Sequence, residues 1–177
     1  MKLNLPPIVL AMLEQRGGIF DPNLRGSQEY LGKMCTEQGY PLHPSVMDFE
    51  AAFGGLVLPD DGAKVGQGEP EWFFGTFACL SGGGHVAPRG GGKGQKRVPV
   101  VYSPRDIVYF LDAQGCAYAQ DTIEDTKAVL YASNGTALVC RILLDDAFFS
   151  RKETSVELKG LQGEALSQRF ALSRIAE

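Results

Sequence analysis

Two adjacent glycines, Gly54 and Gly55, separate an apolar helical pattern from an apolar strand pattern and constrain how this chain can fold. Ser45 stands at the start of the helical pattern and Asp48 follows three residues later, an arrangement typical of a helix N-cap. The apolar residues of the helix recur at i, i+3 and i+7 and share one face: Val46, Phe49 and Phe53. Either glycine can adopt a positive φ at low cost and end the helix. We therefore expect the two phenylalanines to be buried and the chain to turn directly into a strand at Leu56–Leu58.

Length and charge favour one soluble domain that binds a protein. The chain has 177 residues, enough for a filled core, and a formal net charge of -4, which favours a basic protein over nucleic acid as the partner. No apolar run approaches transmembrane length, and the stretch 8–13 is too short for a secretory signal, so we expect a cytoplasmic protein with no membrane partner. Four widely spaced cysteines are expected to be free thiols rather than disulfides: Cys35, Cys79, Cys116 and Cys140.

Helical patterns come first, strand patterns occupy the middle, and helical patterns return at the end, an order typical of the α+β class. We predict one domain over 1–177, with a mixed, mostly antiparallel sheet flanked by helices from the N- and C-terminal parts. Within it we expect a helix and turn over 1–26, a flexible glycine-rich basic loop over 82–97, and a tail with a helix over 150–177. The expected strands are 56–58, 72–80, 98–102, 107–111 and 116–119.

The segment 136–149 is apolar on several faces and is compatible with a buried helix or a strand. Its length favours a helix that begins at Ser133 or Asn134.

The order of these elements resembles the SUKH superfamily, whose bacterial members are mostly immunity proteins against secreted toxins. The resemblance spans about 31–149, and its motifs in chain order are Gly39-Tyr40-Pro41-Leu42, Phe49–Phe53 before Gly54-Gly55, Asp112–Gly115 before Cys116–Ala119, and Ala132-Ser133 before an apolar helix. The family implies an α+β fold, no catalytic residue, no cofactor, and a protein toxin, often a nuclease or deaminase, whose active site is blocked. A regulatory interaction domain is the alternative that the family leaves open. The segment 82–97 has no counterpart in the family pattern.

Acidic residues and a tryptophan follow the glycine pair and are the candidate partner-binding residues: Asp60, Asp61, Glu69, Glu71 and Trp72. The interpretation without a binding role is a solvated loop followed by a core strand that contains the aromatic run 72–74. The functional interpretation is an acidic patch that meets the basic substrate cleft of a toxin, with the indole as an aromatic anchor. The acidic flank of the aromatic run would repel phosphate, which argues against nucleic acid as a partner.

The basic segment 82–97 has the composition of a phosphate-binding loop but not its spacing. Ala87 stands where that motif requires glycine, and Gly94 stands where it requires Ser or Thr. We therefore interpret the segment as a mobile hairpin loop. Its basic residues can contact an acidic or phosphate group: Arg89, Lys93, Lys96 and Arg97.

Metal binding and nucleophilic catalysis have little support in the pattern. Neither histidine, His43 or His85, has another ligand type at a metal-binding spacing, so we predict no metal site. Cys79 and His85 form the one pair worth naming for an enzyme that uses a thiol, the least favoured alternative.

Overall fold

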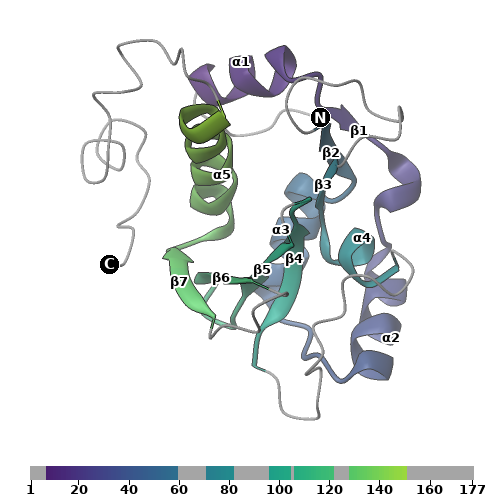
Figure 1. The fold of residues 1–177 in the computed structure, drawn as a ribbon. Coiled ribbons are helices and arrows are strands. Elements are labelled where there is room, and N and C mark those ends of the chain that lie inside the picture. Colours follow the sequence, from purple (N-terminus) through teal and green to yellow (C-terminus); the bar gives the residue numbers. More distant parts are fainter. Residues whose placement is uncertain (1–6, 60–70, 82–95, 105, 122–127, 151–177) are drawn as a thin grey trace.

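The computed structural model describes residues 7–59, 71–81, 96–104, 106–121 and 128–150. Its strands form one seven-stranded sheet, in which each strand pairs antiparallel with the next strand along the chain (Figure 1). The strands are β1 (Ile19–Phe20), β2 (Leu56–Pro59), β3 (Glu71–Phe74), β4 (Val98–Tyr102), β5 (Ile107–Leu111), β6 (Ala117–Asp121) and β7 (Val129–Ala132). The helices are α1 (Pro7–Gln15), the 3₁₀ turn η1 (Pro22–Leu24), α2 (Gln28–Gln38), α3 (Pro44–Phe53), α4 (Thr76–Ser81) and α5 (Gly135–Ser150). The predicted α+β class, with a mostly antiparallel sheet and helices from both ends of the chain, is confirmed.

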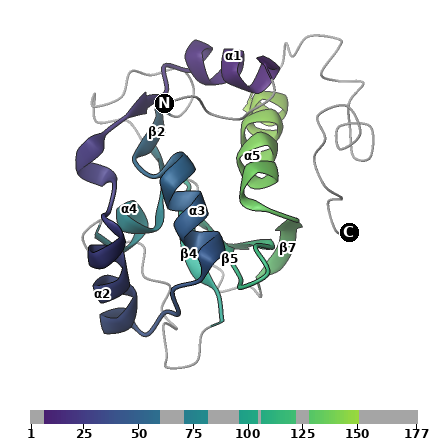
Figure 2. The same ribbon diagram turned by 180° about the vertical axis from the view of Figure 1, so that it is seen from behind.

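Helices cover both faces of the central strands, so β5 is buried on both sides. Val108 and Phe110 point to one face, where they pack in a small cluster with Cys79 of α4. Tyr109 and Leu111 point to the other face and belong to the main core. The α3 helix lies behind the sheet in the view of Figure 1 and in front of it in Figure 2. An unbroken apolar strand such as β5 is what a doubly covered sheet position requires.

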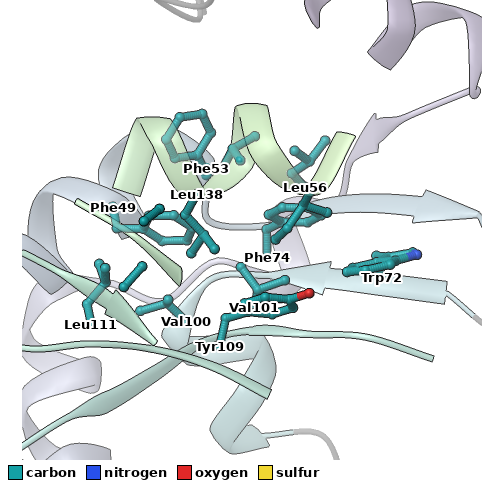
Figure 3. Close-up of a cluster of buried hydrophobic side chains, with 14 of the residues drawn as sticks. Phe49, Phe53, Leu56, Trp72, Phe74, Val100, Val101, Tyr109, Leu111 and Leu138 are labelled. Atoms are coloured by element: carbon teal, nitrogen blue, oxygen red, sulfur yellow. The ribbon is translucent and has the colours of Figure 1, made fainter. Parts of the chain in front are cut away.

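The main core fills the space between α3, α5 and the sheet (Figure 3). Phe49 and Phe53 are each 3 % exposed, and their ring centroids lie 5.1 Å apart, so the prediction that both are buried is confirmed. The predicted helix over 136–149 is also confirmed as α5. Asn134 caps it, because its Oδ1 accepts a hydrogen bond of 2.8 Å from the Ala137 N–H.

Two predicted elements differ in the structure. The run 72–80 is not one strand: β3 ends at Phe74, Gly75 has a φ of +114°, and α4 follows. Ser45 is not the cap of α3, because Pro44 begins the helix and His43 occupies the cap position without a side-chain hydrogen bond. The Ser45 hydroxyl instead donates 2.8 Å to the Asp112 carbonyl oxygen. The first difference goes with a contact between distant segments, since Glu50 accepts from Thr76 at the start of α4, whereas the second follows from the position of Pro44.

Parts or all of three predicted segments lie outside the described residues. They are the first six residues of the N-terminal segment, residues 82–95 of the basic loop, and the tail over 151–177.

Candidate functional site

The glycine pair makes the turn from α3 to β2 because of its conformation and its lack of side chains. Gly55 has a φ of +80°, so the prediction of a positive φ at one of the two positions is confirmed, whereas Gly54 has a φ of -56°. A Cβ atom on Gly55 would collide with the backbone carbonyl of Asp21. A Cβ atom on Gly54 would lie 2.7 Å from Oε1 of Glu50. The corner therefore needs two glycines, the second for its φ and both for the space around them.

The carboxylate of Glu50, beside which Gly54 and Gly75 leave room, joins three segments of the chain. It is 2 % exposed and accepts backbone N–H bonds from Gly26 at 3.0 Å, from Thr76 at 2.7 Å and from Phe77 at 3.5 Å. Two of these donors lie in the first turn of α4, whose N–H groups have no partner within the helix. We call this arrangement the Glu50 clasp. It fixes α3 against the start of α4 and against the segment before α2.

Burial raises the pKa of the Glu50 carboxyl above its ordinary value. The backbone donors of the clasp and the positive charge of Arg25 act in the opposite direction without cancelling the effect of burial. The sequence does carry a signal for this residue, because Glu50 stands four residues after Val46 and three before Phe53, on the apolar face of the helix. A carboxylate at such a position has to find buried donors.

The predicted acidic patch falls largely outside the described residues: Asp60, Asp61 and Glu69. Glu71 begins β3 opposite Pro59. Trp72 is 4 % exposed and stacks on Tyr109 at a centroid distance of 6.3 Å (Figure 3). The expectation that its indole is an exposed anchor for a partner is therefore wrong, and the alternative assignment to a core strand is confirmed. Its side chain points to the main core because β3 alternates between the two faces of the sheet.

Cys79 lies in α4 and is 3 % exposed, in a setting opposite to that of a reactive thiol. Burial, followed by the negative charge of Glu50, raises the pKa of the Cys79 thiol. The same two causes raise the pKa of the Cys35 thiol to about 11. His85, the other half of the predicted pair, lies outside the described residues. Within the parts of the chain that the structure describes, no three His, Cys, Asp or Glu side chains are grouped so that they could hold a metal ion.

An open pocket of about 610 Å³ lies beside the turn between β5 and β6. Three separate segments form it: the connection from α2 to α3, the residues that lead into β4, and the β5–β6 hairpin. We call it the hairpin pocket, and its lining residues are Pro41, His43, Lys96, Arg97, Asp112, Ala113, Gln114 and Tyr118.

One wall of the hairpin pocket is an ordered stack of a cation on an aromatic ring. The guanidinium carbon of Arg97 lies 3.7 Å from the centroid of the Tyr118 ring, a cation–π contact. The Tyr118 hydroxyl donates 3.1 Å to Oδ2 of Asp112. Burial, followed by this hydrogen bond and the charge of Asp112, raises the pKa of the Tyr118 hydroxyl, and the charge of Arg97 opposes the change. The ring is thus held at both its face and its hydroxyl end.

The Asp112 carboxylate is itself fixed by the hairpin turn. Its Oδ1 accepts backbone N–H bonds of 3.0 Å from Gln114 and 2.9 Å from Cys116, the arrangement by which aspartate stabilises a tight turn. Elsewhere in the lining, Nε2 of His43 lies 3.2 Å from the Lys96 carbonyl oxygen. Hydrogen bonds of the backbone and of side chains therefore fix the residues that line the pocket.

Lys96 and Arg97 were predicted to lie in a mobile loop able to contact acidic groups. The stacked position of Arg97 shows that the end of that segment is ordered by the hairpin.

Among the helices that the structure describes, none is long and apolar enough to cross a membrane. Comparisons with protein-family models, with curated proteins and with solved structures found no match.

Proposed function

We propose that this chain is an immunity protein that binds a bacterial toxin and neutralises it by covering the toxin's active site. The sequence resemblance to the SUKH superfamily supports this proposal, and the observation that carries it furthest is the ordered pair of Arg97 and Tyr118 on the open hairpin pocket. Arginine and tyrosine are enriched among the residues that contribute most to protein–protein binding. A surface that presents both in a concave site is suited to a protein partner.

The fixed positions of Arg97 and Tyr118 in the unbound chain matter for affinity. Immobilising a flexible side chain on association makes the free energy of binding less favourable by about 0.5–1.5 kcal/mol. The ring of Tyr118 is already held by Asp112, and Arg97 is already stacked on that ring. The cost of ordering them is therefore met during folding and not during association.

The acidic residues after the glycine pair stay in the proposal as a second contact that affects the rate of association: Asp60, Asp61, Glu69 and Glu71. Trp72 is withdrawn from the proposed contact because it is a core residue.

Co-expression with the products of neighbouring genes tests the proposal. The full chain is expected to restore growth to cells that make the toxin, and one molar equivalent of purified chain is expected to abolish the toxin's activity in solution. Binding without loss of activity would indicate the regulatory interaction domain instead. Failure to protect against any toxic product of the native locus would refute the proposed function.

A further inference from the structure

We infer that the hairpin pocket binds a single carboxylate, supplied by an acidic side chain of the protein partner, with Arg97 as its main ligand and Lys96 as a second cation. The identity of the partner as a toxin rests on the proposed function. The preference of the pocket for a carboxylate rests on the pocket alone.

The position of Arg97 leaves its hydrogen-bonding edge available. The cation–π contact with Tyr118 uses the face of the planar guanidinium, whereas all of its N–H donors lie in the plane. Among the described residues, no acceptor or ion-pair partner is present for these donors. A planar fork of parallel donors matches the two oxygens of a carboxylate, which it binds through two hydrogen bonds.

The charges of the pocket match a ligand with one negative charge. Lys96 and Arg97 supply two positive charges, and Asp112 supplies one negative charge, so the lining has one positive charge in excess. The Asp112 carboxylate is occupied by the Tyr118 hydroxyl and by two backbone N–H groups. A carboxylate balances the remaining charge, whereas a phosphate monoester carries about -1.5 to -2 at pH 7 and would be left partly uncompensated.

The same charges explain how the chain could block an active site. Many enzymes use carboxylates as acids, bases or metal ligands. An arginine that is presented on a rigid ring can pair with such a carboxylate and remove it from the reaction. The acidic residues after the glycine pair and the hairpin pocket would then contact groups of opposite charge on the same partner.

Nuclear magnetic resonance titration of the labelled full-length chain tests the pocket without the partner. The probes are sodium acetate and sodium phosphate at pH 7, with sodium chloride keeping the ionic strength constant. We expect acetate to shift the Arg97 Nε–H and Tyr118 ring signals saturably. Arg97→Met is expected to weaken acetate binding at least tenfold, and Arg97→Lys, which keeps the charge but loses the fork, is expected to weaken it by a smaller factor.

Lys33→Gln is the matched control, because Lys33 is an exposed cation on α2 that pairs with Glu37 at 3.9 Å and lies outside the pocket. It is expected to leave acetate binding unchanged. Amide spectra of each variant establish that it is folded, and Arg97→Lys remains informative if Arg97→Met is not. Absence of a saturable shift, equal acetate affinity in wild type and a folded Arg97 variant, or tighter binding of phosphate than of acetate would overturn the inference.

The partner, once identified, separates this inference from the proposed function. If Arg97→Met inhibits the toxin as strongly as the wild-type chain does, the pocket is refuted as the contact with the toxin and the immunity function stands. Specific acetate binding by a chain that inhibits no toxin would refute the function and leave the carboxylate site standing.

Discussion

Removal of the Glu50 carboxylate tests whether the clasp holds the helices together. Glu50→Ala leaves the N–H groups of Gly26 and Thr76 without the acceptor that now lies at 3.0 Å and 2.7 Å. The bond from Thr76 is buried, and the bond from Gly26 is only partly so. Water can therefore replace the acceptor at Gly26 more readily than at Thr76.

The two positions together set the expected magnitude. A buried donor that loses its acceptor costs about 1–3 kcal/mol, and a partly buried donor costs less. The variant also loses the unfavourable desolvation of Glu50, which the raised pKa of this carboxyl reflects and which offsets part of the loss. We expect Glu50→Ala to lower the free energy of unfolding by about 3 kcal/mol. Glu50→Gln keeps one acceptor oxygen and is expected to lower it by about half as much.

Urea denaturation at pH 7, followed by tryptophan fluorescence, measures these changes. Trp72 is the single tryptophan of the chain and is buried, so its emission reports exposure of the core. Glu37→Ala serves as the control, because Glu37 is an exposed carboxylate in an i,i+4 pair, and such a substitution changes stability by about 0.5 kcal/mol or less. A loss below about 1 kcal/mol in Glu50→Ala, close to that of the control, would refute the structural role of the clasp.

Three further predictions concern the corner, the pocket and the dependence on pH. Gly55→Val is expected to lower the free energy of unfolding by about 1–3 kcal/mol, since a β-branched residue is strained at φ +80°, whereas Gly17→Asn, at φ +69° with open space around it, should change the urea midpoint little. Tyr118→Phe removes the hydrogen bond to Asp112 and should cost about 1 kcal/mol in the same assay. Because the pKa of Glu50 is raised in the folded state, the native chain binds more protons than the unfolded chain between the two pKa values, so its stability falls as pH rises through that window. The stability difference between wild type and Glu50→Gln should shrink across the same window, and a difference that grows with pH would contradict the assigned direction.

Local patterns were sufficient for α1, α2, α3 and α5 and for the helix-to-strand corner, but not for α4. Ser27 caps α2 and Gly39 ends it in the left-handed conformation, both through groups within a few residues of the helix. The glycine pair and the two phenylalanines likewise follow from spacing along the chain. These features depend on contacts that are close in sequence, which is why a single sequence predicts them.

Features that depend on distant contacts were not predictable in the same way. The change from strand to helix at Gly75 is stabilised by Glu50, which stands 26 residues before Thr76. The burial of Trp72 depends on its contact with Tyr109 in a strand that is not its neighbour in the sheet. The hairpin pocket is assembled from three separated segments, so the sequence showed the basic character of Lys96 and Arg97 and the turn at Asp112–Gly115 but not their assembly into one site.

The meander of the sheet has a consequence for how the chain folds and unfolds. From β4 to β7 each strand follows the preceding one after a short connection, so this part of the sheet can grow by successive closure of hairpins, which costs less chain entropy than the pairing of remote strands. The Glu50 clasp instead joins groups that are 24 and 26 residues apart, and it requires α3 and the start of α4 to be in place. We therefore expect the clasp to form after the rate-limiting step of folding. Its loss would then mainly speed unfolding and shorten the lifetime of the folded protein, with little effect on the rate at which it forms.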